Sequence, residues 1–226
     1  YTVTFSTPAG YQPTLSNVGN DTTDSDPVNG QTVITITNGS SNTTTDAGFW
    51  RPATLGDYVW EDLNHDGQQN DGATGANGVS VTLLNSSNQV VSTTTTNGSG
   101  AYSFTNLISG TYHVSFTLPS GYQWTTANSG SDTIDSDGVA SGNVAVTTDY
   151  VLNAGQSITT VDQGVWQPAT IGNSVWEDLD HDGQQDLNES GISGVVVTIQ
   201  TPTGTVTTTT DASGQYTFTN LVAGTY

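Results

Sequence analysis

The sequence predicts an all-β protein built from Greek-key β-sandwiches, and three observations lead to that fold class. Apolar and polar residues alternate in short runs rich in Val, Thr and aromatic residues, such as Val79, Val81 and Leu83. Turn signals such as Asn97-Gly98 separate these runs. The 226 residues include 26 Gly, and no segment has the pattern of a long amphipathic helix.

Seven strands are expected in the segment 52–167. About seven short strands within some 110 residues are typical of a Greek-key sandwich. The expected strands are residues 56–61, 78–84, 88–96, 101–105, 111–118, 143–148 and 157–165.

The chain repeats itself with a period of about 111–116 residues. Trp60 matches Trp176, and the pattern T-x3-G-x-Y-x-F-x-N-L begins at Thr96 and again at Thr210. The period predicts three parts: residues 1–51 are the C-terminal half of a repeat, 52–167 a complete repeat and 168–226 the N-terminal half of another.

Each repeat closes on the pattern Trp-x-Pro, at Trp50 and at Trp166. A bulky aromatic residue followed closely by Pro indicates a stiff joint rather than a flexible tether. These Trp side chains either pack in the core at the end of a last strand or contact the next domain, and the sequence leaves both open.

The half repeats at the two ends allow two arrangements. Because the chain has no starting Met, signal peptide or long apolar segment, we expect a processed chain or a fragment without direct membrane insertion. It is either a window of a longer repetitive chain, or residues 168–226 of one subunit are completed by residues 1–51 of the next. Both arrangements make the chain its own partner, in a head-to-tail filament or a tandem array.

The segment 178–189 follows the pattern D-x-D-x-D-G-x5-E, in which every position of the twelve-residue calcium loop is present. Calcium prefers six to eight oxygen ligands, and this loop supplies them from fixed positions. The alternative is a solvated acidic turn. The expected ligands are Asp178, Asp180 and Asp182 through their carboxylates, Gln184 through its backbone carbonyl, Asp186 through a water, and Glu189 through both oxygens.

The segment 62–73 is a second copy of this loop, with Ala73 in place of the closing Glu. Without that bidentate carboxylate its site should be weaker, unless Asp71 substitutes. The histidines at position 4, His65 and His181, are expected to be solvated. Strand-like runs flank both loops, which favours rigidity over signalling. The expected ligands of this copy are Asp62, Asn64, Asp66, Gln68 and Asp71.

Two further acidic clusters occur at equivalent places in the repeat. Three carboxylates within six positions, together with a distant Asp, could hold another calcium ion. The alternative is an Asx-rich turn whose side chains bond to their own backbone. The clusters are Asp132, Asp135 and Asp137 with Asp162, and Asp21, Asp24 and Asp26 with Asp46.

The net charge is −20, and Arg51 is the only Lys or Arg. Such a surface is unsuited to nucleic acid and to anionic membranes. The clustering of the acids indicates cation binding, and repulsion among them would destabilise the metal-free fold. We expect no enzyme, because the sequence contains no nucleophile motif, phosphate loop or HExxH motif, and His113 has no evident partner.

The chain resembles the B-type repeat domains of serine-aspartate repeat adhesins, within the wider collagen-adhesin B-type, prealbumin-like group. The residues that carry the resemblance are G-[DN]-x-V-W-x-D-x-[ND]-x-D-G-x-Q, then G-x-x-G-V-x-V-T, then G-x-Y-x-F-x-N-L-x-x-G-x-Y. The resemblance implies tandem calcium-stiffened sandwiches along an extracellular stalk at the cell surface. Relatives often carry a Lys–Asn isopeptide crosslink, which cannot form here because the chain has no Lys; with no Cys either, calcium is the only staple left.

The expected function is structural, as part of an extracellular filament, stalk or surface fibre. The alternative is an adhesin or carbohydrate-binding module that contacts a surface polysaccharide or a host protein. This alternative requires an exposed aromatic platform, for which Tyr122 and Trp124 are the first candidates and Tyr11 and Tyr150 the next. A third possibility, an accessory domain of a secreted hydrolase, requires a catalytic domain outside this sequence.

Overall fold

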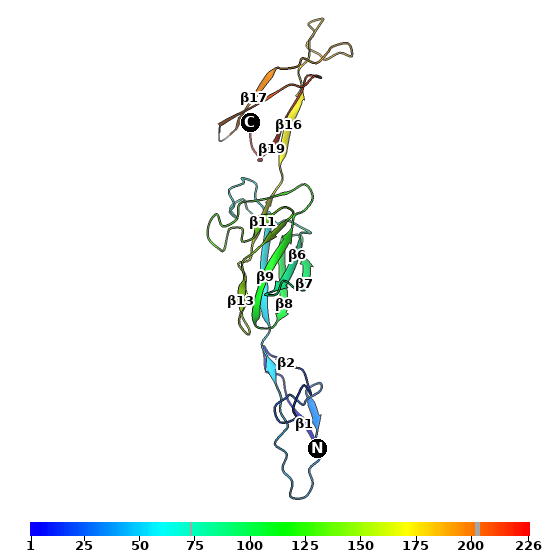
Figure 1. The fold of residues 1–226 in the computed structure, drawn as a ribbon, viewed down its shortest axis with the longest axis vertical. Helices are drawn as coiled ribbons and strands as arrows, with labels where there is room; N and C mark the ends of the chain where they lie inside the picture. The colour runs from blue at the N-terminus through cyan, green and yellow to red at the C-terminus, as the bar shows by residue number, and fades with distance from the viewer. Residues whose placement is uncertain (73, 202–203) are drawn as a thin grey trace.

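The computed structural model describes residues 1–72, 74–201 and 204–226. Within these residues every regular element is a strand, so the all-β prediction is confirmed. The molecule is elongated, with three lobes along its long axis and the two termini in the outer lobes (Figure 1). Among the described residues there is no helix with the length and apolar character needed to span a membrane.

The middle lobe contains a five-stranded sheet organised around its first strand, β5 (Ala53–Glu61). β5 pairs antiparallel with one neighbour and parallel with the last two strands of the lobe, so that its first and last strands run side by side in one direction. The neighbours are β8 (Ala101–Leu107), β14 (Ser157–Ile158) and β15 (Gln163–Trp166), and β10 (Gln123–Trp124) pairs with β15.

The second sheet of this lobe has six strands and is organised around β9 (Gly110–Thr117). On one side β9 pairs with β6, which in turn pairs with β7; on the other side it pairs with β12 and β13, and β12 pairs with β11. The bounds are β6 (Ser80–Asn85), β7 (Val90–Thr95), β11 (Val139–Ser141), β12 (Val144–Val146) and β13 (Tyr150–Leu152).

Alternate residues of the two sheets form one core between them. Leu55 and Val59 of β5 are completely buried, as are Val81 of β6 and Val114 and Phe116 of β9. Period-2 alternation places these side chains on the inner faces while their neighbours face outward. The two sheets therefore form the sandwich that the sequence predicts.

All seven expected strands are present, and the structure adds three short ones. The expected strand 157–165 is divided into β14 and β15, because residues 159–162 leave the ladder while Val161 enters the core. The additional strands β10, β11 and β13 have two or three residues each, too few for alternation to be recognised in the sequence.

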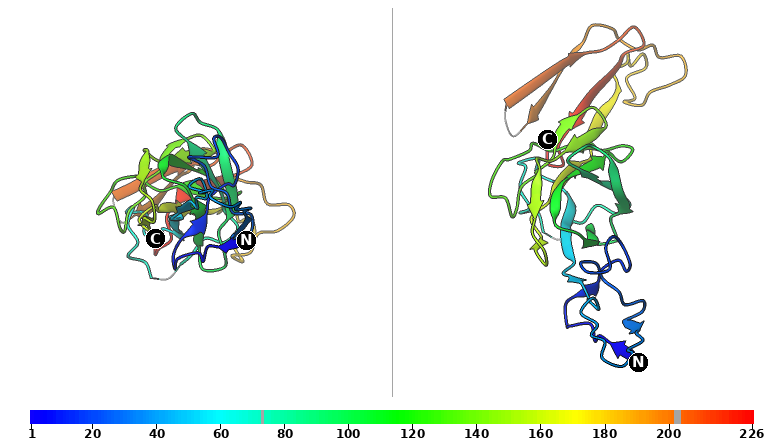
Figure 2. Two further views of the ribbon diagram at one scale, coloured as in Figure 1. Left: turned by 90° about the horizontal axis from the view of Figure 1, so that it is seen from below. Right: turned by 60° about the horizontal axis from the view of Figure 1, so that its bottom comes forward.

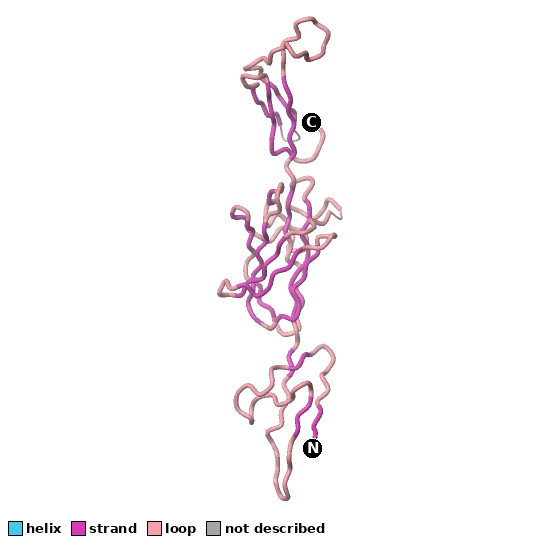
Figure 3. The backbone as a smooth tube through the Cα atoms, turned by 90° about the vertical axis from the view of Figure 1, so that its right-hand side faces the viewer, coloured by secondary structure: helices cyan, strands magenta, loops and turns pink. Residues whose placement is uncertain are grey.

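The outer lobes repeat pairings of the middle lobe. The three lobes are seen from other sides in the right view of Figure 2 and in Figure 3. The pairing of Ile171 with Phe218 corresponds to that of Leu55 with Phe104, and Gln12–Trp50 corresponds to Gln123–Trp166. The upper lobe has a small core of Ile199, Phe218 and Leu221. The strands are β1 (Thr2–Thr4), β2 (Gln12–Pro13), β3 (Gln31–Val33), β4 (Phe49–Trp50), β16 (Ala169–Ser174), β17 (Val196–Thr201), β18 (Gly204–Thr209) and β19 (Gln215–Leu221).

Candidate metal sites

The loop 62–73 follows β5, and its backbone folds back to donate hydrogen bonds to the carboxylate of its first residue, Asp62. The Asp62 oxygens accept hydrogen bonds from the backbone N–H groups of Asp66 (3.2 Å) and Gly67 (2.9 Å) and from the Thr125 hydroxyl. His65 (φ 59°) and Gly67 (φ 83°) adopt the left-handed conformation, which allows the chain to turn tightly. Asp62 is 1 % exposed, so this end of the loop is part of the protein interior.

The middle of this loop is an exposed polar network. Asp66 accepts hydrogen bonds from the Gln68 N–H (2.9 Å) and from the side-chain amides of Asn70 (2.7 Å) and Asn64 (3.1 Å). The Asn70 hydrogen bond is the main cause that lowers the pKa of Asp66. Asp66 is therefore poised as an anionic oxygen donor beside the amide oxygen of Asn64.

Asp71 takes the place that the closing Glu has in the other loop. Its Oδ2 accepts the N–H of Leu63, at position 2, at 2.8 Å. In the loop 178–189, Oε1 of Glu189 accepts the N–H of Leu179, also at position 2, at 2.7 Å. The hypothesis that Asp71 substitutes for the missing Glu is thus supported by equivalent contacts, although its role as a ligand stays a prediction. Ala73 lies outside the described residues.

The loop 178–189 has the same backbone form, with His181 at φ 63° and Gly183 at φ 77°. Asp178 accepts the N–H groups of His181 (2.7 Å) and Gly183 (3.0 Å). One oxygen each from Asp178, Asp180 and Asp182 lies within 4.8 Å of the others.

Glu189 holds the end of this loop through hydrogen bonds to the backbone, and its role as a ligand stays a prediction. Glu189 is 8 % exposed, and its second oxygen accepts the N–H of Asp186 at 3.0 Å. Oδ1 of Asp182 accepts the N–H of Gln184 at 2.7 Å. Three converging carboxylates and a closing Glu are a donor set that fits a hard divalent cation such as calcium.

The cluster around Asp162 is buried in the middle lobe. Asp137 and Asp162 exchange hydrogen bonds: the Asp162 N–H donates to Oδ2 of Asp137 (2.6 Å), and the Asp137 N–H donates to the Asp162 carbonyl (3.0 Å). Asp135 is also buried and accepts the Gly130 N–H at 2.8 Å, whereas Asp132 is exposed. The structure thus places three of the four expected carboxylates in the interior.

Asp162 is the least satisfied of these carboxylates. In the part of the chain that the structure describes, neither of its oxygens has a hydrogen-bond partner of good geometry, although Asp162 is only 1 % exposed. Burial raises the pKa of Asp162 to about 8, with further increases from Asp57 and from the neighbouring carboxylates and a decrease from Gln69. Burial likewise raises the pKa of Asp137 to about 7. A buried carboxylate without donors requires a proton or a cation.

The two acidic groups of the middle lobe are in direct contact. Gln68 forms a β-bridge with Asp135, and the Gln69 N–H donates to the Ile134 carbonyl at 2.7 Å. At Gly67 a Cβ would meet Ser129 and the Thr126 carbonyl at 2.5–2.8 Å. The loop 62–73 therefore packs tightly on the segment 126–137, and the two sets of candidate ligands lie next to each other.

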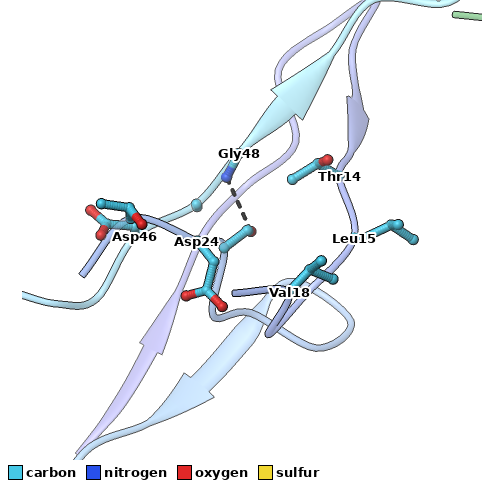
Figure 4. Close-up of a pocket in the computed structure, with 9 residues that line it drawn as sticks. Thr14, Leu15, Val18, Asp24, Asp46 and Gly48 are labelled. Atoms are coloured by element: carbon cyan, nitrogen blue, oxygen red, sulfur yellow. Dashed lines mark hydrogen bonds between the residues drawn. The ribbon is translucent and has the colours of Figure 1, made fainter. Parts of the chain in front are cut away.

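The equivalent cluster of the lower lobe lies open (Figure 4). Asp24 and Asp46 line a hollow of about 420 Å³, and Oδ1 of Asp24 is buried with no hydrogen-bond partner among the residues that the structure describes. Oδ2 of Asp26 accepts the Asp46 N–H at 2.5 Å, as Asp137 does for Asp162, whereas Asp21 and Asp46 are exposed. By the repeat alignment, this hollow corresponds to the space that the loop 62–73 fills in the middle lobe.

Some residues of the site were missed in the sequence. Asp57, in the middle of β5, contributes to the raised pKa of Asp162, and its own pKa is raised by burial. The Thr125 hydroxyl and the Gln69 amide also belong to the site. The signal for Asp57 was available, because it occupies the D/N position of the pattern G-[DN]-x-V-W, where Asn173 stands in the next copy.

Two histidines differ from expectation. His65 is half-buried and stacks on Trp166, with ring centroids 4.3 Å apart, so the expectation that it is solvated was wrong. His181 is exposed, as expected. His113 is buried and has a partner that the sequence did not reveal, since its Nδ1 lies 3.1 Å from Oδ1 of Asp149.

The two aromatic residues first suggested for ligand binding are half-buried and pack against the core. The Tyr122 hydroxyl donates to Glu61, and this hydrogen bond, with burial, raises the pKa of Tyr122 to about 12. Nε1 of Trp124 donates to the Gly142 carbonyl at 3.1 Å. Their contacts are those of structural residues, and a role in ligand binding stays a prediction.

Comparison with known proteins places the chain in a family. Residues 53–165 and 169–226 match the family described as SdrD B-like domain. The chain belongs to this family. The resemblance inferred from the motifs is thereby confirmed, and serine-aspartate repeat proteins are cell-surface proteins, so the chain is extracellular, at the cell surface.

Two groups of relatives illustrate the match. Serine-aspartate repeat-containing protein F of Staphylococcus epidermidis is 44 % identical over 232 residues, covering 100 % of this chain and 13 % of that protein. Serine-aspartate repeat-containing protein D of Staphylococcus aureus (strain Newman) is 43 % identical over 232 residues, covering 100 % and 17 %. The chain thus spans less than a fifth of the length of these curated relatives, 13 % of one and 17 % of the other.

Among solved structures, a streptococcal ancillary pilin matches with a TM-score of 0.38 and 14 % identity, covering 96 % of this chain and 64 % of that chain. The Bacillus anthracis TIE protein matches with a TM-score of 0.38 and 15 % identity, covering 74 % and 26 %.

Proposed function

We propose that this chain is part of a calcium-rigidified stalk or fibre at the bacterial surface, in which β-sandwich repeats follow one another end to end. The observation that carries the proposal is Asp162, which lies beside Asp137 and Asp135 and whose two buried oxygens have no hydrogen-bond partner of good geometry among the described residues. A cation at this point would neutralise charges that the metal-free fold buries at a cost.

Calcium suits the donor set better than a transition metal does, because every candidate ligand is an oxygen. When bound, the ion supplies positive charge and crosslinks segments distant in sequence. In the middle lobe this would tie the end of β5, through Asp62, to the segment 126–137 and to Asp162. The residues that would hold calcium are the two loop sets, led by Asp62 and Asp178, and the two clusters around Asp162 and Asp46.

The composition of the chain makes crosslinks through calcium more important for stability. The chain has no Cys and no Lys, so neither a disulfide nor a Lys–Asn isopeptide bond can crosslink a repeat. One site at an ion concentration about a hundred times its dissociation constant adds about 2.7 kcal/mol of stability. Several sites would rival the whole stability of a domain of this size, ~5–10 kcal/mol.

Calorimetric titration of the chelator-treated chain with calcium tests the proposal. We expect saturable binding and a higher unfolding temperature in calcium than in magnesium. Asp162→Asn should remove binding at its cluster. The matched control is Asp211→Asn, because Oδ1 of Asp211 accepts the N–H of Ser213 (2.8 Å) just as Oδ1 of Asn97 accepts that of Ser99 (3.0 Å) in the middle lobe. Absence of binding at millimolar calcium would overturn the proposal.

A further inference from the structure

In the part of the chain that the structure describes, a hydrogen bond between two side chains crosses each joint between lobes, and the two hydrogen bonds are equivalent in the repeat. At the lower joint, Nε2 of Gln12 donates to Oδ1 of Asn106 over 3.5 Å. At the upper joint, Nε2 of Gln123 donates to Oδ1 of Asn220 over 3.0 Å. Both Gln residues end a Gly-Tyr-Gln sequence, and both Asn residues belong to the repeated Asn-Leu pattern. The same contact has therefore formed twice from the same residues.

The backbone holds both partners in the same way at each joint. Asn106 (φ 57°) and Asn220 (φ 55°) adopt the left-handed conformation, which Asn tolerates better than most residues. Gln12 is paired with Trp50 across its ladder, and Gln123 with Trp166. The donor amide thus always stands beside the Trp that ends its repeat.

At the upper joint the candidate calcium loop 62–73 reaches the contact. His65, at position 4, stacks on Trp166, which is the ladder partner of Gln123. The neighbouring Asn64 lines a cavity of about 700 Å³ together with Asn220 of the next lobe. A continuous series of contacts therefore leads from this loop to the next repeat.

The lower joint has a different support. The Arg51 guanidinium lies over the Tyr11 ring, 5.4 Å from its centroid, and the Arg51 carbonyl accepts the Gly155 N–H at 3.2 Å. A hollow of about 370 Å³ between the lobes is lined by Tyr11, Arg51 and Ile108, among others. The only Lys or Arg of the chain is thus placed at a joint, where the upper joint has Gln167.

We propose that each repeat ends in a docking face for the next repeat of the same chain. The face consists of the glutamine of the Gly-Tyr-Gln sequence beside the terminal Trp, and the left-handed Asn of the next repeat binds to it through its side-chain oxygen. At the upper joint, the loop 62–73 supports this face through the stack of His65 on Trp166, so calcium at the loop fixes the angle between the two repeats. The calcium part rests on the proposed function, whereas the Gln–Asn contact does not depend on it.

Distances between spin labels on the full 226-residue chain test the docking face. The chain has no Cys, so Thr93→Cys and Thr207→Cys, at exposed and equivalent strand positions, introduce two unique labels across the upper joint. In calcium we expect one narrow distance distribution, which Gln123→Ala and Asn220→Gly should broaden without a change in unfolding temperature. Asn220→Gly keeps the backbone conformation and removes only the amide.

The control is Gln12→Ala, the same substitution at the other joint, which should leave this distribution narrow and broaden one measured from a label at Thr2→Cys to Thr93→Cys. A narrow distribution in both Gln123→Ala and Asn220→Gly would overturn the docking face. His65→Ala and chelation should each broaden the upper-joint distribution.

Calorimetry on the same samples separates the two proposals. If calcium binds and neither chelation nor His65→Ala changes the distribution, the coupling of the loop to the joint is overturned while the proposed function stands. If calcium does not bind, the proposed function fails, and broadening in Gln123→Ala still supports the docking face.

Discussion

The two copies of the calcium loop, 62–73 and 178–189, have nearly the same sequence and very different surroundings. In both, the residue at position 4 and the Gly at position 6 are left-handed, and the first Asp accepts the N–H of that Gly. In the first copy Asp62 is buried beneath Thr125 and the loop packs on the segment 126–137. In the second, Asp178 is half-buried and Asp180 and Asp182 are exposed.

The conformation of these loops and their burial therefore have separate physical causes. Side-chain to backbone hydrogen bonds within twelve residues determine the conformation, so it recurs wherever the sequence recurs. Burial depends on segments that lie more than sixty residues away in the chain, as the contact between Asp62 and Thr125 shows. The first copy should therefore be coupled to the folding of its lobe, and the second should behave as a local site.

Removal of calcium should give the largest effect, a loss of stability in the middle lobe, which contains the buried first copy. Two occupied sites in the middle lobe contribute about 5 kcal/mol if each is saturated at about a hundred times its dissociation constant. Chelation should therefore lower the unfolding temperature of the middle lobe sharply, as measured by scanning calorimetry. An unchanged transition, with binding shown separately, would mean that the sites lie outside the cooperative unit.

The pH dependence of the metal-free protein should be the next largest effect. Asp137 and Asp162 have folded-state pKa values of about 7 and about 8, above the ordinary 3.8. The stabilisation from their protonated forms is fully present below about pH 4. It decreases as the pH rises and is lost once the pH has passed the folded-state pKa values of about 7 and about 8. Denaturation in chelator should show a free energy of unfolding that falls by up to about 1.4 kcal/mol per pH unit for each of the two groups over this range. Asp162→Asn should flatten the profile, and a profile that rises with pH would contradict the burial of these groups.

Substitution of the first Asp separates the two loops in the absence of metal. Asp62→Ala leaves the buried donors of Gly67 and Thr125 without an acceptor, which should cost about 2–3 kcal/mol even in chelator. Asp178→Ala exposes its donors to water and should cost well under about 1 kcal/mol under the same conditions. Chemical denaturation measures both, and equal losses would show that burial does not distinguish the loops.

Substitution of the closing carboxylate should have the smallest effect. Glu189→Ala and Asp71→Ala each remove the acceptor for the N–H at position 2, and each should weaken calcium binding at its own loop by about tenfold, or ~1.4 kcal/mol. Ala73→Glu should tighten the first loop. Titration calorimetry gives the affinities; if Asp71→Ala has no effect, Asp71 is not the substitute for the missing Glu.

Much of this architecture was readable from the sequence, and the exceptions have physical reasons. The strand β6 and the left-handed Gly183 follow from local alternation and from the loop pattern. The stack of His65 on Trp166 and the pair of His113 with Asp149 were not foreseen, because each joins residues far apart in the chain. The burial of Asp162 was missed for the same reason, since it depends on how the loop 62–73 packs.

The parallel pairing of β5 with β14 and β15 determines how the middle repeat responds to tension. A force along the long axis is applied to the middle repeat at Ala53, the first residue of β5, and at Trp166, the last residue of β15. Because the two strands run in the same direction, the pull slides one along the other in shear. The ladder hydrogen bonds then resist together, whereas a hairpin pulled from its open end loses them one after another. The strand order therefore allows the middle repeat to carry tension as well as to separate its neighbours.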